Sequence, residues 1–346
     1  MGNLRIDNRL IGEDCKPFAI AEIGINHEGI YEKAVRMVND AYKAGAECVK
    51  LQLHIANEEM VRNDVIPGNA KESIWDIIER SELTIDEHFK IKKLVDALGM
   101  IYLCTPFSRK AADILEEFNV KAFKIGSGEC NNYPLIEYIS KFKKPIILST
   151  GMNDINSIRK SINIFNKNNI NYALLHCTSI YPTPYDKVRL GVLLEFKREF
   201  KDVPVGLSDH SIGIYISLAA VALGASVIEK HFTSTRAWKG PDISISLNPK
   251  ELKDLITGIN YVQLAKGGRK NILLEEQPTI NFAYASVVSL KAIKRDEILS
   301  EENIWVKRPG NGDIRAEYYD DLIGKRARQD IKKNTQLSWG MIKDGK

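Results

Sequence analysis

Eight short apolar runs rich in β-branched residues recur along the chain, and segments typical of helices lie between them. The segments 32–44, 85–98 and 109–118 carry apolar residues at a spacing of three and four, which indicates amphipathic helices. Strands that alternate with helices pair in parallel, and eight such units in about 250 residues make a closed (β/α)8 barrel. The sequence therefore predicts an α/β barrel, with a doubly wound open sheet as the second choice. The apolar runs begin at Phe18, Cys48, Met100, Ala122, Pro145, Tyr172, Val203 and Val227.

The C-terminal part of the chain follows a different pattern. After a barrel of residues 1–268, a linker is expected at 269–285, which combines glycine, proline and charge without clear periodicity. Residues 286–346 have the pattern of short strands and turns, which predicts a small β-rich domain. Because about sixty residues make a marginal core, this domain is expected to pack against the barrel or against a second chain.

Composition and charge exclude several classes of function. Forty-nine Lys and Arg against 45 Asp and Glu leave a net charge of +4, which gives little support to nucleic-acid binding. No run approaches the roughly 18 to 20 apolar residues that span a bilayer, and the first residues lack the apolar core of a signal peptide. A cytoplasmic protein is therefore expected. Five cysteines without a CxxC spacing predict neither a disulfide framework nor a thiolate zinc site, and Cys104 and Cys177 are expected in the core.

Polar residues gather where each predicted strand ends, which is where barrels of this kind carry their active sites. Lys50 and Lys124 lie inside apolar strands, and a buried ammonium needs an anionic partner. One interpretation is an internal ion pair with Glu22 or Glu229. The favoured interpretation is a cradle for a small anion that carries both a phosphate and a carboxylate group. Three hydroxyls are expected at the same rim, those of Ser127, Ser149 and Ser208.

His210 and His231 end the last two predicted strands, which are neighbours in a barrel. Two imidazoles beside carboxylates and without thiolates suggest an octahedral Mn²⁺, Mg²⁺ or Co²⁺ site with open positions, in place of a closed zinc site. The other histidines, His27, His54, His88 and His176, are interpreted as structural by default, and a site role for His27, close to the first predicted strand, stays open.

Nine strings of residues stand out, in order, along nearly the whole chain: AEIGINHEG (21–29), TPFSR (105–109), FKIGSGECNNYPLI (123–136), ILSTGM (147–152), LLHCTSIYPTP (174–184), GLSDHS (206–211), EKHFT (229–233), GPD (240–242) and WVKRPGNGD (305–313). Together they closely resemble bacterial sialic acid synthases. The resemblance implies a barrel followed by an antifreeze-like (SAF) domain, in a homodimer that swaps this domain between subunits. It also implies N-acetylneuraminate synthase activity, in which phosphoenolpyruvate, N-acetylmannosamine and water give N-acetylneuraminate and phosphate.

The resemblance also implies roles for single residues. Those implied for phosphoenolpyruvate are Lys50, Thr105, Lys124, Ser127, Ser149, Ser179 and Ser208, and those for the amino sugar are Glu22, Gln52, Tyr181, Asp242 and Arg308. His210 and His231 match two ligands of a divalent metal, with Mn²⁺ as the expected ion. Arg308 matches an arginine that one subunit inserts into the barrel of the other. The catalytic residues are expected to be Glu129, His210 and Glu22, with Glu129 handling a proton.

Two departures from the family pattern concern substrate contacts. Ser179 stands where close relatives carry an Asn that contacts phosphate, and KLQLH at 50–54 replaces the more usual KHQTH. A serine still donates a hydrogen bond, so a weaker or water-bridged phosphate contact is expected. Leu51 and Leu53 alternate with Lys50 and Gln52 and should face away from the lumen.

Alternative functions remain open at the level of sequence. A legionaminate or pseudaminate synthase would use a related sugar that differs at C4 and C6, and a deoxy-octulosonate synthase is a more distant possibility. A non-catalytic carbohydrate-binding protein is the alternative from another class, but it leaves the two buried lysines and the histidine pair unexplained.

Overall fold

The computed structural model describes residues 2–68 and 70–344. They form two compact units, with the division between Gly267 and Gly268. The first unit is the predicted barrel, and the second is the small β-rich domain. Among the described residues, no helix combines the length and apolar character that crossing a bilayer requires.

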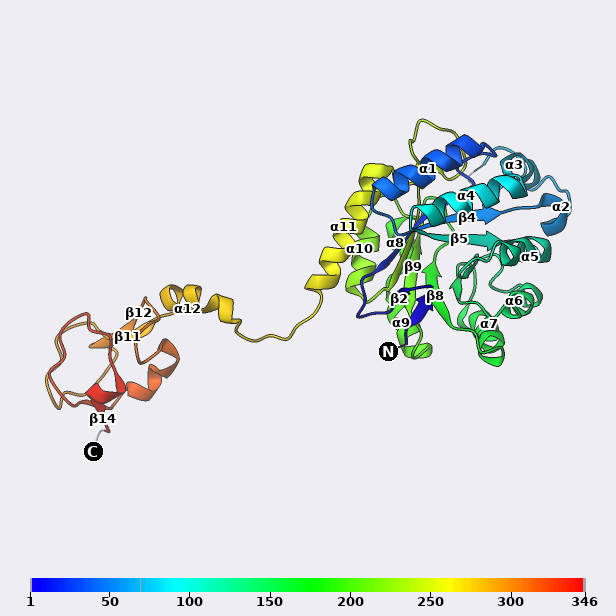
Figure 1. The fold of residues 1–346 in the computed structure, drawn as a ribbon. Coiled ribbons are helices and arrows are strands. Elements are labelled where there is room, and N and C mark those ends of the chain that lie inside the picture. The colour runs from blue at the N-terminus through cyan, green and yellow to red at the C-terminus, as the bar shows by residue number, and fades with distance from the viewer. Residues whose placement is uncertain (1, 69, 345–346) are drawn as a thin grey trace. The chain divides into compact units, whose positions relative to one another are not determined.

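Eight parallel strands form the first unit, with helices around them (Figure 1). In hydrogen-bonded order they are β5 (Ile101–Pro106), β4 (Cys48–Leu53), β3 (Phe18–Gly24), β10 (Val227–His231), β9 (Val205–Asp209), β8 (Tyr172–Cys177), β7 (Ile146–Ser149) and β6 (Phe123–Ile125). Strands β5 and β6 lie next to each other without a hydrogen-bonded ladder, so the barrel is nearly closed. The predicted (β/α)8 fold is confirmed.

The helices of the first unit follow the predicted amphipathic segments closely. The longer ones are α1 (Tyr31–Lys43), α3 (Ile74–Ser81), α4 (Ile85–Ala97), α5 (Arg109–Glu117), α6 (Tyr133–Ser140), α7 (Ile155–Lys167), α9 (Gly191–Glu199), α10 (Tyr215–Ala222) and α11 (Pro249–Ala265). Short helical turns are α2 (Ala56–Glu59), α8 (Tyr185–Val188) and η1 (Ile243–Ile245). Capping boxes at Thr84 and Asn248 start α4 and α11, because each side chain accepts the N–H three residues later. Helix α10 begins at Tyr215, and before it Asp209 accepts hydrogen bonds from the N–H and hydroxyl of Ser211.

Alternate residues of each strand face the lumen, and the lower part of the lumen is apolar. Phe18, Cys48, Leu103, Ile147 and Leu175 belong to one buried cluster there. The same cluster contains Leu4, Ile6 and Ile11 from a hairpin of β1 (Leu4–Ile6) and β2 (Arg9–Ile11). This hairpin was not predicted, and it plugs the N-terminal end of the barrel. Leu51 and Leu53 belong to the cluster outside the lumen, as expected.

The second unit contains two small antiparallel sheets. Strands β11 (Ser286–Ser289) and β12 (Ile304–Lys307) form one, and β13 (Arg326–Ala327) and β14 (Ile342–Lys343) form the other. Its 3-10 helices are η2 (Leu274–Glu276), η3 (Ala316–Tyr318), η4 (Asp320–Leu322) and η5 (Trp339–Met341).

The segment expected as a linker is partly helical. Within 269–285 lie η2 and α12 (Gln277–Ala283), and α12 buries Ile280. The N–H of Gly310 donates to the carbonyl oxygen of Asn281 at 2.9 Å. Helix α12 is therefore part of the second unit.

Candidate active site

A cavity of about 420 Å³ opens at the C-terminal ends of the barrel strands. Nearly every barrel residue singled out in the sequence lines it: Glu22, Lys50, Gln52, Thr105, Lys124, Ser127, Glu129, Ser149, Ser179, Tyr181, Ser208, His210 and His231. Asp242 lies beside this cavity, with Oδ2 3.8 Å from Nδ1 of His231. Arg308 belongs to the second unit.

The two buried lysines lie among carboxylates and hydroxyls. Nζ of Lys50 is 2.8 Å from Oε2 of Glu22, and Nζ of Lys124 is 3.6 Å from Oε1 of Glu229. Lys124 also donates to the hydroxyl of Ser149 at 2.7 Å. The internal ion pair and the anion cradle are thus compatible, because the same ammonium groups that meet the carboxylates face the cavity.

The two lysines differ in how well their charge is balanced. Burial works to lower the pKa of Lys50, but the carboxylates of Glu22 and Glu229 together outweigh burial and leave this pKa above its usual value. Burial lowers the pKa of Lys124, because the more distant Glu229 compensates only in part. An anion in the cavity would therefore stabilise the charge of Lys124 in particular.

Glu129 presents a buried carboxyl group to the cavity. Its Oε2 atom has no hydrogen-bond partner among the described residues. Burial raises the pKa of Glu129 from about 4.5 to about 7. A carboxyl group that titrates near neutral pH is suited to accept or donate a proton during a reaction.

His210 and His231 lie close together in the cavity wall, with ring centroids 5.3 Å apart. Burial and then His210 lower the pKa of His231, so its imidazole is neutral, which is the form that binds a metal. Its buried Nδ1 atom has no hydrogen-bond partner among the described residues. Nδ1 of His210 lies 3.3 Å from the carbonyl oxygen of Thr178, which favours a proton on Nδ1 and leaves Nε2 free.

These two imidazoles fit a divalent ion that completes its coordination with water and substrate. Within residues 2–68 and 70–344, no three His, Cys, Asp or Glu side chains are close enough to share one ion. A closed structural site with four protein ligands is therefore not formed by the described residues.

A buried ion pair supports the two histidines from behind. Nζ of Lys230 lies 3.0 Å from Oδ2 of Asp209 and also donates to the carbonyl oxygens of Asp209 and Ser211. Lys230 precedes His231, and Asp209 and Ser211 flank His210. The pair thus ties together the backbone segments that carry both imidazoles.

Comparison with known proteins identifies the family. Residues 37–271 match the NeuB family, and residues 284–343 match the SAF domain. The chain belongs to the NeuB family. The predicted resemblance to sialic acid synthases is thereby confirmed at the level of the family.

Proteins similar to this NeuB chain are named as synthases of several related sugar acids. The chain is 41% identical over 92% of its length to 98% of an N,N'-diacetyllegionaminic acid synthase of Campylobacter jejuni. It is 34% identical over 94% of its length to 97% of a pseudaminic acid synthase of the same species. The crystal structure of an N-acetylneuraminic acid synthetase of Leptospira borgpetersenii, in complex with citrate, has 32% identity and a TM-score of 0.74, over 80% of this chain and 95% of that one. This NeuB chain is therefore an enzyme of the sialic, legionaminic and pseudaminic acid synthase superfamily.

From the sequence, Glu229 was named only as an ion-pair partner, and Phe107 and Cys177 were given no role in this NeuB cavity. Glu229 faces both lysines and accepts a hydrogen bond from Ser208 at 3.0 Å. It lies two residues before His231 and so on the same strand face, and its approach to the lysines agrees with the predicted ion pair. Phe107 and Cys177 also line the cavity, and Cys177 is buried, as expected. The sulfur of Cys177 lies 3.7 Å from Nδ1 of His210.

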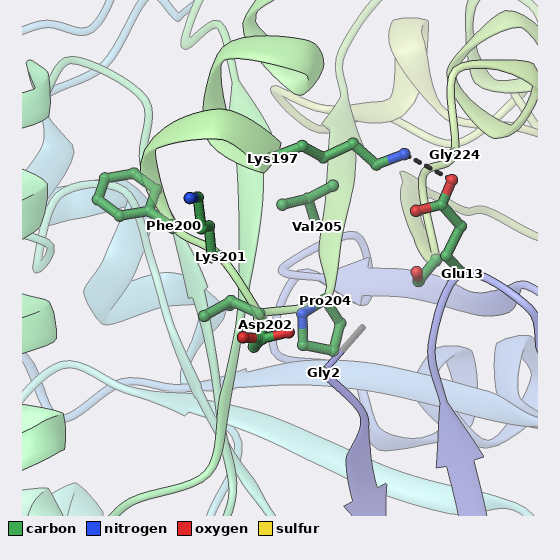
Figure 2. A pocket seen from close by; sticks show the side chains of 11 residues that line it. Gly2, Glu13, Lys197, Phe200, Lys201, Asp202, Pro204, Val205 and Gly224 are labelled. Atoms are coloured by element: carbon green, nitrogen blue, oxygen red, sulfur yellow. Dashed lines mark hydrogen bonds and ion pairs between the residues drawn. The ribbon is translucent and has the colours of Figure 1, made fainter.

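A further cavity, of about 400 Å³, lies at the other end of the NeuB barrel (Figure 2). Lys197 and Glu13 form an ion pair of 2.7 Å in its wall, and Val205, which begins β9, also lines it. Barrel enzymes carry their chemistry at the C-terminal ends of the strands, which is the opposite end from this cavity.

Proposed function

We propose that the chain joins phosphoenolpyruvate to an N-acetylated mannosamine and water, giving a nine-carbon sugar acid and phosphate. The observation that carries the proposal is the cavity in which two buried lysines and several hydroxyls lie beside the histidine pair. A purely carbohydrate-binding protein would leave these cations without a role. N-acetylmannosamine, which gives N-acetylneuraminate, is the acceptor that the sequence resemblance implies. The 41% identity to an N,N'-diacetyllegionaminic acid synthase favours a diacetamido sugar as the second candidate.

In the proposed mechanism, Lys50 and Lys124 bind the phosphate and carboxylate groups of phosphoenolpyruvate. The hydroxyls of Thr105, Ser149 and Ser208 complete the cradle, with Ser127 and Ser179 at its outer side. Charge-assisted hydrogen bonds in a buried site hold this substrate in a fixed orientation. C3 of phosphoenolpyruvate then bonds to the aldehyde carbon of the sugar, whose oxygen takes up a proton.

Water adds at C2, where positive charge develops, and Glu129 accepts its proton. The tetrahedral intermediate then loses phosphate by cleavage of the C–O bond. Glu22, Gln52, Tyr181 and Asp242 orient the sugar. His210 and His231 would hold a divalent ion, with Mn²⁺ as the first choice and Mg²⁺ or Co²⁺ as alternatives, and this ion would supply Lewis-acid polarisation of the aldehyde oxygen.

Phosphate release tests the proposal directly. Inorganic phosphate should appear only when phosphoenolpyruvate, an acceptor sugar and a divalent ion are all present. His210→Ala should bind Mn²⁺ more weakly in a titration followed by electron paramagnetic resonance, with its melting temperature little changed. Full activity after exhaustive chelation contradicts the metal proposal, and absence of turnover with every acceptor contradicts the synthase proposal.

We propose that the active form is a cytoplasmic homodimer in which the SAF domain of one subunit brings Arg308 to the barrel of the other. A mixture of Arg308→Ala and His210→Ala proteins, under conditions that exchange subunits, tests this arrangement. In a swapped heterodimer one site receives both defects and the other receives none, so activity should return. No recovery after demonstrated exchange means that Arg308 serves its own barrel.

A further inference from the structure

A succession of polar contacts runs from helix α2 to the candidate active site. Oε1 of Glu59, the last residue of α2, lies 2.8 Å from Nδ1 of His54. Nε2 of His54 lies 3.0 Å from the side-chain oxygen of Gln52, whose amide donates to Oε1 of Glu22 at 3.0 Å. The other carboxylate oxygen of Glu22 lies 2.8 Å from Nζ of Lys50. These contacts therefore connect α2 with a buried cation of the cavity.

The contacts of His54 determine which of its ring atoms carry hydrogen. A glutamate carboxylate and an amide oxygen only accept hydrogen bonds. Both ring nitrogens of His54 face such acceptors, so both donate, and the ring is an imidazolium that pairs with Glu59. The two side chains are only 5% and 4% exposed, so the pair is buried. His54 thus holds the oxygen of Gln52 with a charge-assisted hydrogen bond.

The partners of Gln52 favour one of the two orientations of its amide group. Turned over, the amide would place its oxygen against Oε1 of Glu22, where two acceptors would meet if the carboxyl group is ionised. The ammonium group of Lys50, 2.8 Å from the same carboxylate, favours that ionised form. The orientation in which the NH₂ group meets Glu22 is therefore stabilised from both ends.

His54 and Glu59 act from outside the cavity wall. Among the described residues that line the active-site cavity are Gln52 and Phe107, but neither His54 nor Glu59. The ring of His54 stacks on Phe107, with centroids 4.3 Å apart and planes 13° from parallel. Glu59 is fixed in turn, because its Oε2 accepts the N–H of Ile55 at 3.4 Å. The pair is thus rigidly placed behind two residues of the wall.

We propose that His54 and Glu59 are positioning residues for the acceptor sugar, and that they act by fixing the amide of Gln52. This inference rests on the proposed function, in which Gln52 orients the sugar. Among the described residues the Gln52 amide has one acceptor, Glu22, so its second N–H is available to an oxygen atom of the sugar. Without the imidazolium, the amide can turn over and withdraw this donor. The lysines that bind phosphoenolpyruvate keep their own partners.

Two substitutions of His54 separate positioning from packing. His54→Phe keeps a ring against Phe107 but donates no hydrogen bond, whereas His54→Gln loses the ring and keeps a donor for Gln52. The phenylalanine variant should lower kcat/KM for the sugar about 10- to 100-fold, because a hydrogen bond from a charged group is lost. The glutamine variant should retain more of this activity. The KM for phosphoenolpyruvate should stay within about threefold of the wild type in both.

The assay uses the full-length enzyme with Mn²⁺ and the acceptor that the wild type converts, N-acetylmannosamine or 2,4-diacetamido-2,4,6-trideoxymannose. A phenylalanine variant that is as active as the glutamine variant or more active means that the ring only packs, and this result overturns the inference. So does an equal rise in KM for both substrates. No turnover by the wild type with either sugar contradicts the proposed function itself, and the inference falls with it.

A double-mutant cycle tests whether His54 acts through Gln52. If it does, His54→Phe should change kcat/KM for the sugar by no more than about twofold when Gln52→Ala is already present. A full additional loss in that background means that His54 acts independently and overturns the inference. His88→Phe is the matched control, because His88 is a histidine of α4 that is 2% exposed and contacts Tyr102 in place of Gln52. It should leave kcat/KM for the sugar within about twofold of the wild type.

Glu59→Gln tests the same pair if the variants of His54 do not fold. The substitution keeps the shape of the side chain but removes the charge that stabilises the imidazolium. A fall of about 3- to 10-fold in kcat/KM for the sugar is expected, with the KM for phosphoenolpyruvate unchanged. A folded Glu59→Gln enzyme with the sugar kinetics of the wild type overturns the inference.

Discussion

The two ends of the barrel lumen are built from the same strands but differ in chemistry. Cys48, Leu103 and Ile147 face the lower lumen and pack against the β1–β2 hairpin. Two residues further along the same strands, Lys50, Thr105 and Ser149 face the cavity. Because side chains alternate in a strand, one strand can supply a packed core at one end and a polar site at the other.

The lower lumen, at the N-terminal ends of the strands, stabilises the fold, whereas the upper lumen, at their C-terminal ends, is suited to bind a ligand. In the lower lumen, apolar side chains are fully buried and satisfied by packing. In the upper lumen, Oε2 of Glu129, Oε2 of Glu229 and Nδ1 of His231 are buried without hydrogen-bond partners among the described residues. Buried polar atoms without partners destabilise the fold, so such atoms in one cavity indicate groups kept ready for a ligand.

Among substitutions in the upper lumen, Glu129→Gln should lower the catalytic rate most. Loss of a general base lowers kcat by about 10²- to 10⁴-fold. With burial raising its pKa to about 7, the wild-type rate should increase as pH rises through 7 and Glu129 loses its proton. In a pH–rate profile the glutamine variant should lack this rise near pH 7, the ascending limb, and Glu129→Asp should retain it. A limb that persists in the glutamine variant assigns the proton transfer to another group.

The same substitution, which should lower activity, should raise the stability of the fold. The folded state binds the proton of Glu129 more tightly than the unfolded state does, because the pKa of this carboxyl group is about 7 in the folded protein and about 4.5 when it is not buried. Its contribution to stability is therefore present below pH 4.5 and is lost as pH rises through 7. Thermal unfolding should show that Glu129→Gln stabilises the protein more at pH 8 than at pH 4.

Ile6→Ala should affect the lower lumen only. Ile6 is fully buried in the hairpin, and truncation of a buried isoleucine costs about 2 to 5 kcal/mol of unfolding free energy. Denaturant unfolding measures this loss. The KM values for both substrates should stay near those of the wild type, and a large change in either would mean that the two ends of the lumen are not independent.

Lys124→Met should raise the KM for phosphoenolpyruvate about 10- to 100-fold, because a hydrogen bond to a charged group is worth about 1.5 to 3 kcal/mol. The KM for the sugar should change much less. Steady-state kinetics with each substrate varied in turn measure both. An equal rise in the two values would show that Lys124 acts by balancing Glu229 and not by binding substrate.

Periodicity along the chain was sufficient to predict the barrel and most residues of the cavity. Lys50, Lys124 and His231 could be placed because each interrupts an apolar strand near its C-terminal end. Cys177 is buried, as predicted, but a barrel strand is buried on both faces, so its hydrophobic pattern did not show that this side chain also lines the cavity. The hairpin plug depends on contacts between distant segments, although Asp7 and Asn8, between two short runs that pair as strands, were a local turn signal that was not used for the prediction.

Ser179→Asn should give the smallest effect and concerns the outer part of the phosphate cradle. Ser179 lines the cavity and is only partly buried, so a longer side chain has room to extend toward the cavity. An asparagine amide reaches further than a serine hydroxyl and replaces a water-bridged contact with a direct hydrogen bond, worth about 0.5 to 1.5 kcal/mol. The KM for phosphoenolpyruvate should therefore fall about 3- to 10-fold, with the KM for the sugar unchanged. Ser179→Ala is the matched control and should raise the same KM. If neither substitution changes it, Ser179 lies outside the phosphate cradle, and binding of phosphoenolpyruvate depends on the two lysines and the inner hydroxyls alone.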